Sequence, residues 1–237
     1  MIVTWVSKQG GRPINEDAVG KSYKRGIFCI VVADGLGGHN GGQIASDLAV
    51  TTILDAFNSN PGFSQTHIKE YILSANKAIS ERAKTDPDLL HMSSTVAVLL
   101  QKGRYAIWAN VGDTRVYRLS DGMISDVSED HSLAFIDFVN GMIEYDGIRT
   151  SPNQNKLTNA LGIAMDGINI SPKVHISSFD HFVLCTDGWW EYVTEDDIER
   201  TLNDTKNPER WLKAMLEIRE AKAPDDSDNY TAAVVSV

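Results

Sequence analysis

The sequence has little cysteine and no surplus of positive charge. Only two of its 237 residues are cysteine, Cys29 and Cys185, and both lie in apolar runs. Free cysteines in such runs are typical of a buried core, so we expect neither a disulfide nor a thiol nucleophile. Asp and Glu outnumber Lys and Arg by 32 to 22, which gives a net charge of -10. Nucleic acid and anionic membranes are therefore not expected as partners, because both require a basic face.

Long apolar segments are also missing. No apolar run approaches the roughly 20 residues that a membrane-spanning helix needs. The stretch from Met1 to Gly20 has no apolar segment followed by a cleavage site of the kind found in signal peptides. We therefore expect a cytoplasmic protein that does not bind membranes, with a monomer as the default state. The composition, 42% hydrophobic and 23% charged, is that of an ordinary globular protein.

One stretch combines a buried strand with a glycine-rich turn. Residues 27–33 are apolar and rich in Val and Ile, which predicts a buried strand. Asp34 follows directly, and glycine at positions 35, 37 and 38 leaves the backbone bare beside it. A carboxylate held at a strand end next to backbone carbonyls suits a hard cation such as Mg²⁺ or Mn²⁺.

The remaining pattern changes from strand to helix and back to strand. Two helical stripes are followed by short β-rich segments, which predicts a mixed fold with antiparallel sheet. The segment from Ser128 to Asn159 is the least regular and is predicted to be a mobile flap or small subdomain. His131 within it is a candidate catalytic residue, although a lone histidine is more often structural. Strands are predicted over residues 2–7, 27–33, 95–100, 105–109, 116–119, 182–186 and 232–237, and helices over 43–57, over 65–84, from Thr194 and from Pro208.

Acidic residues stand where predicted strands begin or end. Crowded carboxylates repel one another unless protons or cations intervene, and divalent cations are the simplest solution at neutral pH. Two such ions about 3.5–4 Å apart can share a water and lower its pKa. Asp34 is the best placed to bridge them. The acidic positions are Asp34, Asp113, Asp187 and Asp228, with Glu16 and Asp17 beside an early strand.

A phosphate ester is the substrate that fits divalent cations held by these acids next to an arginine. Arg12, close in sequence to Glu16, can hold a phosphate through its paired donors. No Ser-His-Asp set and no cysteine-centred loop offers another nucleophile. The predicted reaction is therefore direct attack of a metal-activated water on phosphorus.

Five short motifs follow one another along the chain. They are Arg12 with Asn15-Glu16-Asp17, then Asp34-Gly35-Leu36-Gly37-Gly38-His39, then Gly112-Asp113-Thr114-Arg115, then Cys185-Thr186-Asp187-Gly188, then Asp228-Asn229-Tyr230-Thr231. In this order and spacing they resemble the PP2C-type (PPM, metal-dependent) protein serine/threonine phosphatases, in their bacterial single-domain form. The resemblance implies one catalytic domain over residues 1–237. It also implies an α+β fold, a four-layer αββα sandwich of two antiparallel sheets flanked by helix pairs, with a flap near 128–159.

The resemblance assigns roles at the first two metal positions. Asp34 matches the aspartate that bridges both ions, and Gly35 matches the residue whose backbone carbonyl binds one of them. Asp187 and Asp228 match the remaining direct ligands of the first ion.

It also assigns roles around the second and third ions. Glu16 matches an acid that holds the second ion largely through water, and Asp17 matches a nearby acid of that water network. Asp113 matches a ligand of the third, weaker ion of bacterial relatives. Arg12 matches the arginine that binds the substrate phosphate.

Three positions depart from the family pattern or are given a structural role. Leu36 stands where animal members carry a histidine proposed as general acid, so the leaving group must take its proton from water or another group. Bacterial relatives also lack that histidine, so its loss does not indicate inactivity. Ser93 stands in Met92-Ser93-Ser94-Thr95 where the family has the glycine of Gly-Thr-Thr, which is expected to reshape a strand start slightly. The glycines around His39 suggest a structural role for it.

The implied function is hydrolysis of phosphoserine and phosphothreonine in proteins, without a phosphoenzyme and with two Mn²⁺ or Mg²⁺ ions and a weaker third. The expected partners are phosphoproteins and a cognate Ser/Thr kinase. Two alternatives stay open at this point. One is a non-catalytic phosphoprotein-binding module on the same fold, which usually loses a metal carboxylate. The other is a phosphatase for a small molecule or for an anti-sigma-factor antagonist.

Overall fold

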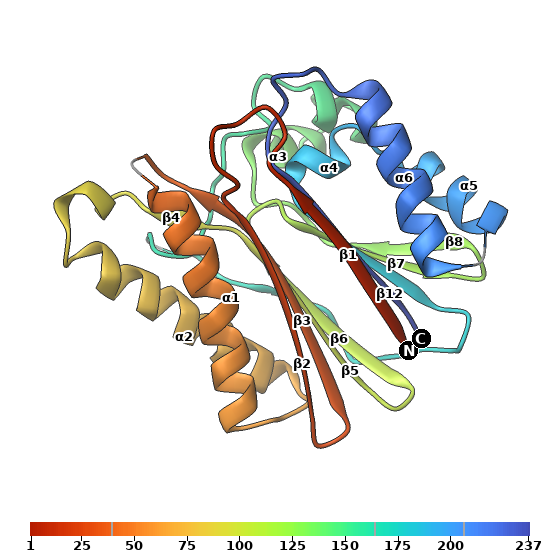
Figure 1. Ribbon diagram of the computed structural model, residues 1–237, viewed down its shortest axis with the longest axis horizontal. Helices are drawn as coiled ribbons and strands as arrows, with labels where there is room; N and C mark the ends of the chain where they lie inside the picture. Colours follow the sequence, from red (N-terminus) through yellow and green to blue (C-terminus); the bar gives the residue numbers. More distant parts are fainter. Residues whose placement is uncertain (39, 164, 206) are drawn as a thin grey trace.

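The computed structural model describes residues 1–38, 40–163, 165–205 and 207–237. Two antiparallel sheets lie face to face, and helices cover the outer face of each sheet (Figure 1). The predicted four-layer αββα sandwich is thereby confirmed. No helix in the described part of the chain is both long and apolar enough to span a membrane.

The first sheet joins the two ends of the chain. Its strand order is β1-β12-β11-β7-β8, and β1 pairs with β12 from Ile2 opposite Ser236 to Lys8 opposite Tyr230. Helices α5 and α6 cover its outer face, and the short α4 follows β11 directly (Figure 1). The elements are β1 (Ile2–Lys8), β7 (Arg115–Ser120), β8 (Met123–Val127), β11 (His181–Cys185), α4 (Asp187–Trp190), α5 (Glu195–Thr205), α6 (Pro208–Lys222) and β12 (Tyr230–Ser236).

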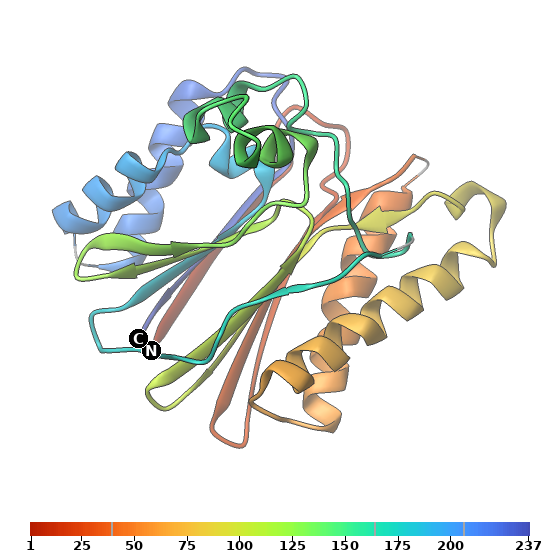
Figure 2. The same cartoon turned by 180° about the vertical axis from the view of Figure 1, so that it is seen from behind.

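The second sheet has the order β10-β6-β5-β3-β2, with β4 and β9 paired to β3 and β6. Helices α1 and α2 pack on its outer face (Figure 2). The elements are β2 (Asp17–Lys24), β3 (Ile27–Leu36), α1 (Gly41–Ser59), α2 (Gln65–Ala83), the 3-10 turn η1 (Pro87–Leu89), β4 (Ser93–Ser94), β5 (Val96–Lys102), β6 (Tyr105–Val111), β9 (Asn169–Ile170) and β10 (Val174–His175).

Strand β3 is buried on both faces, which explains its unbroken apolar sequence. Side chains alternate along a strand, so Phe28 and Ile30 face the other sheet while Cys29 and Val31 face the helices α1 and α2. The strand also runs past the predicted end at residue 33, as far as Leu36. Beyond Asp34 it leaves β5 and pairs with β4, which places Asp34 where β3 changes partner.

The predicted flap, residues 128–159, is more regular than expected. It contains helix α3 (Leu133–Val139) and the 3-10 helix η2 (Tyr145–Thr150). Ala134 and Ile148 are buried in the hydrophobic core that the first sheet forms with α4, α5 and α6. Helix α3 spans only seven residues, and apolar side chains occur all round it. A segment this short shows no helical period, which is why the sequence did not reveal it.

Candidate metal centre and active site

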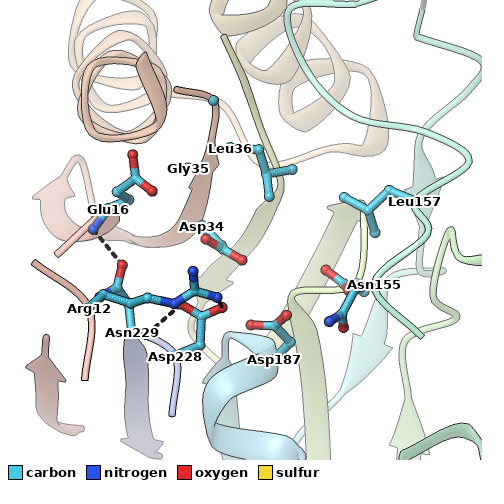
Figure 3. Close-up of a pocket in the computed structure, with 12 residues that line it drawn as sticks. Arg12, Glu16, Asp34, Gly35, Leu36, Asn155, Leu157, Asp187, Asp228 and Asn229 are labelled. Atoms are coloured by element: carbon cyan, nitrogen blue, oxygen red, sulfur yellow. Dashed lines mark hydrogen bonds and ion pairs between the residues drawn. The ribbon is translucent and has the colours of Figure 1, made fainter. Parts of the chain in front are cut away.

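A pocket opens at the end of the sandwich where the predicted acids were expected to meet. Asp34, Asp187 and Asp228 point toward one another inside it, and Glu16 approaches from the side of α1 (Figure 3). These residues come from segments spread along the whole chain. The lining residues are Arg12, Glu16, Asp34, Gly35, Leu36, Gly37, Asp113, Asn155, Leu157, Asp187, Asp228 and Asn229.

The backbone of Asp34 is held by Ser94 and Thr95, where β4 ends and β5 begins. Its backbone N–H donates to Thr95 Oγ1 at 3.1 Å. Its carbonyl accepts hydrogen bonds from the Thr95 N–H and from the Ser94 hydroxyl, both at 2.9 Å. These three hydrogen bonds fix the Asp34 backbone and so the direction in which its side chain leaves the strand. Ser93, the departure from the family glycine, is accommodated in β4 opposite Leu36.

Asp187 and Asp228 lie side by side because β11 and β12 are neighbours. The Thr186 N–H donates to the Thr231 carbonyl at 3.1 Å, next to both acids. A Cβ on Gly188 would stand 2.1 Å from the Asn229 carbonyl oxygen, so glycine permits this close approach. Strand pairing therefore brings together two acids that are far apart in sequence.

Asn229 fixes the loop that carries Arg12 and Glu16. Its Oδ1 accepts the Glu16 N–H at 2.8 Å (Figure 3). Its Nδ2 donates to the carbonyls of Gln9 and Ile14 at 2.6 and 2.9 Å. The amide is thus fully used in holding the loop. The sequence placed Asn229 in a motif, but its role follows only from these contacts.

Asp17 stands behind the pocket wall rather than on it. Its side chain is buried, and its Oδ2 accepts the Thr186 hydroxyl at 2.9 Å. Within the described part of the chain, its Oδ1 is buried without a hydrogen-bond partner. Burial, with the charges of Asp187 and Asp228, raises the pKa of Asp17 to about 7.

Arg12 lies at the mouth of the pocket. Its Nη2 donates to Asp228 Oδ2 at 2.7 Å, and both side chains are partly exposed. Among the described lining residues it is the only one with a positive charge. A single guanidinium faces five carboxylates, so the pocket carries a strong excess of negative charge.

The excess charge shows in the titration of the acids. Burial, followed by the charges of Asp187 and Asp17, raises the pKa of Asp34 well above its usual range. Burial and the charge of Asp228 raise the pKa of Asp187 to about 6. Burial and the charge of Asp187 likewise raise the pKa of Asp113. Positive charge placed among Asp34, Asp113 and Asp187 would favour their ionised forms.

These donors fit divalent cations of the Mg²⁺ and Mn²⁺ class. The described wall offers carboxylate and backbone carbonyl oxygens but no imidazole and no thiolate. No three acids, histidines or cysteines of the described residues close tightly enough to enclose one ion by themselves. Mg²⁺ and its relatives keep several waters and need few direct protein ligands, so an open oxygen-lined pocket suits them.

The structure brings most of the predicted site residues to one pocket. Asn155 and Leu157, which also line it, were not predicted, because they belong to the flap and lie in no motif. His131 does not line the pocket: its Nδ1 accepts the Gly112 N–H at 3.1 Å, which is a structural contact. His39 lies outside the described residues. The predicted residues on the wall are Arg12, Glu16, Asp34, Gly35, Asp113, Asp187 and Asp228.

Comparison with known proteins places this chain in a family. The protein phosphatase 2C family model matches residues 8–224. The serine/threonine phosphatase stp of Listeria monocytogenes is 30% identical over 218 residues, which cover 87% of this chain and 83% of that protein.

Solved structures show the same fold. Stp1 from Staphylococcus aureus superposes with a TM-score of 0.89 at 23% identity, over 99% of this chain and 94% of the other. The catalytic domain of the phosphatase PstP, in complex with two manganese ions, gives 0.85 at 24% identity, over 99% and 97%. As its sequence motifs predicted, the chain belongs to the protein phosphatase 2C family of metal-dependent serine/threonine phosphatases.

Proposed function

We propose that this protein removes phosphate from phosphoserine and phosphothreonine in proteins, and that it does so in the acidic pocket with two Mn²⁺ or Mg²⁺ ions and a weaker third. The observation that carries the proposal is the meeting of five acids and one arginine from distant segments in one pocket. A binding module without turnover would be expected to have lost one of these acids. We treat residues 1–237 as one catalytic unit, with residues 128–159 as its flap.

Each acid has a proposed place in holding the cations. Asp34 lies in the middle and would bridge two ions, with the Gly35 carbonyl beside it. Asp187 and Asp228 would complete the first ion's protein ligands. When bound, the cations supply a water of lowered pKa and offset the charge of the phosphoryl group.

The other three acids are proposed to act around the second and third ions. Glu16 would hold the second ion through water, Asp17 would support that water network from behind, and Asp113 would be a ligand of the third ion. All three carboxylates open toward the same pocket or lie directly behind its wall.

Arg12 is proposed to orient the substrate phosphate. One of its five donors contacts Asp228, so the others remain for phosphate oxygens at the pocket mouth. Leu36 and Leu157 form an apolar part of the wall and can neither give nor take a proton. The leaving serine or threonine oxygen therefore takes its proton from water or from another group of the pocket.

Asp34→Asn tests the proposal. We expect it to lower turnover of p-nitrophenyl phosphate and of a phosphothreonine peptide by roughly 100-fold or more, because the central charge is lost. Asp55→Asn is the matched control, since Asp55 is exposed on α1. Wild-type activity should require Mn²⁺ and disappear with chelator. Full activity of Asp34→Asn, or of the chelated wild type, would contradict the two-ion scheme.

A cognate Ser/Thr kinase is the proposed partner that supplies the substrates. Comparison of the phosphoproteome with and without the protein, followed by dephosphorylation of each candidate in vitro, identifies them. Hydrolysis restricted to one small molecule would contradict this assignment. The cytoplasmic location and the monomeric state stay predictions.

A further inference from the structure

Two acid-bearing elements of the proposed centre are linked by one indole. Asp113 lies in the loop between β6 and β7, whereas Asp187 begins α4. Trp190, in the same turn of α4 as Asp187, donates its Nε1–H to the Asp113 carbonyl at 2.9 Å. The Trp190 side chain is 1% exposed, so this bond is not shared with solvent. It ties the loop to the helix across 77 residues of sequence.

Arg115 holds the face of this indole. Its guanidinium carbon lies 3.7 Å from the centre of the Trp190 ring. Nε and Nη2 of Arg115 donate to the two carboxylate oxygens of Asp130 at 2.9 and 2.6 Å. Both partners are almost fully buried, so neither charge can separate from the other without a large desolvation cost. The ring therefore has a fixed partner on its face and a fixed acceptor at its edge.

The same network reaches the flap. The Tyr117 hydroxyl lies 3.0 Å from Arg115 Nη1 and donates to Glu195 Oε1 at 3.1 Å. The other oxygen of Glu195 accepts from Arg149 in η2. Tyr145 of the flap also donates to Glu195 Oε1, at 3.3 Å. The support around Trp190 is thus anchored in β7, in α5 and in the flap.

The hydrogen bond from Trp190 to Asp113 restrains the loop between β6 and β7 relative to α4. Asp113 and Asp187 line the same pocket, where two negative charges would repel each other. Asp113 stands in a loop that begins with Gly112 in the left-handed region, at φ +89°. A loop of this kind can relax so that two like charges move apart. The bond from Trp190 to the Asp113 backbone opposes that movement, because it acts on the residue that carries the charge.

We propose that Trp190 is a positioning residue of the metal centre: through its bond to Asp113 and its stack on Arg115, it fixes the Asp113 carboxylate relative to Asp187 and so sets the affinity of the weakest cation. This inference rests on the proposed function, since it takes Asp113 and Asp187 as cation ligands. It assigns a metal-binding effect to a side chain that itself offers the cation no ligand.

Trp190→Phe tests the inference, because phenylalanine keeps a ring against Arg115 but lacks the N–H. Trp211→Phe is a matched control. Trp211 is also fully buried, and its Nε1 donates to a backbone carbonyl, that of Ile198, at 3.1 Å, but it lies between α5 and α6. Mn²⁺ binding is measured by isothermal titration calorimetry on both variants and the wild type. Thermal unfolding in chelator shows how much stability each substitution costs.

We expect Trp190→Phe to weaken the weakest Mn²⁺ binding step by roughly three- to tenfold, the value of one buried hydrogen bond. Trp211→Phe should bind Mn²⁺ like the wild type even though it loses comparable stability. Wild-type affinity in Trp190→Phe, or equal weakening in Trp211→Phe, would overturn the inference and leave the proposed function intact. A wild-type protein that binds no Mn²⁺ overturns both.

A second measurement does not depend on the variant folding. The indole N–H signals of the wild-type protein, assigned by triple-resonance NMR, are followed during a Mg²⁺ titration. The Trp190 signal should shift with the last binding step, while the Trp211 signal stays in place. A Trp190 signal that does not move during that step would overturn the inference.

Discussion

Gly35→Ala should destabilise the protein far more than Gly38→Ala, although the two glycines belong to the same glycine-rich stretch. A Cβ on Gly35 would stand 1.9 Å from the Gly42 carbonyl oxygen and 2.8 Å from the Glu16 carbonyl oxygen. The first distance is about 1.5 Å short of ordinary van der Waals contact. The atoms in the way belong to the backbone, so no side chain can rotate to make room.

The expected magnitude follows from this overlap. Forcing extra atoms into a packed site costs about 1–3 kcal/mol, and a backbone clash belongs at the upper end. For a chain of this size, about 3 kcal/mol corresponds to a fall in melting temperature of roughly 6–12 °C. A Cβ on Gly38 meets none of the described atoms within 4 Å. Its replacement by alanine should be neutral or slightly stabilising, because it restricts the unfolded chain.

Thermal unfolding by circular dichroism, in chelator, compares the two variants with the wild type. Chelator separates the backbone clash from any change in cation binding. Calorimetric titration with Mn²⁺ should then show weaker binding for Gly35→Ala, since the Gly35 carbonyl is a proposed ligand. An unchanged melting temperature for Gly35→Ala, or an equal fall for Gly38→Ala, would refute the reasoning.

Two further predictions concern charge. Because burial raises the pKa of Asp17 to about 7, the folded chain binds this proton more tightly than the unfolded chain. The free energy of unfolding without metal should therefore fall between about pH 4 and pH 7, by up to about 4 kcal/mol from this group, and saturating Mg²⁺ should flatten the slope. Urea denaturation across this pH range, with and without Mg²⁺, measures both; stability that rises with pH in chelator would contradict the sign. Arg12→Lys should lower kcat/KM for p-nitrophenyl phosphate by roughly 10- to 100-fold, since one point charge replaces a fork of donors. Steady-state kinetics and a melting curve check this, and an unchanged kcat/KM would remove Arg12 from phosphate binding.

The sequence predicted the fold best where one physical signal dominated. Strand β3 was recognised because burial on both faces makes residues 27–33 apolar throughout. Its extension to Leu36 was missed, because the last pairing depends on β4, a two-residue strand. Helix α3 was missed for a similar reason, since seven residues do not establish a period.

The site was predictable where side-chain chemistry alone identified a residue. Asp34, Asp187 and Asp228 stand out as acids beside apolar strands, and the structure brings their side chains together. Asn155 and Leu157 carry no such mark, and only the path of the flap brings them to the pocket. The withdrawal of Asp17 behind the wall also depends on tertiary packing, because Thr186, between β11 and α4, holds it.

The pairing of the first strand with the last has a consequence for biosynthesis. Strand β1 cannot pair within its sheet until residues 230–236 have left the ribosome, because β12 separates β1 from every other strand of that sheet. Contacts between such distant segments form late and slow the search for the native topology. Asp228, next to β12, reaches Arg12 and Asn229 reaches Glu16 in the same late step. The nascent polypeptide therefore cannot acquire activity gradually, because the site is complete only after β12 has paired with β1.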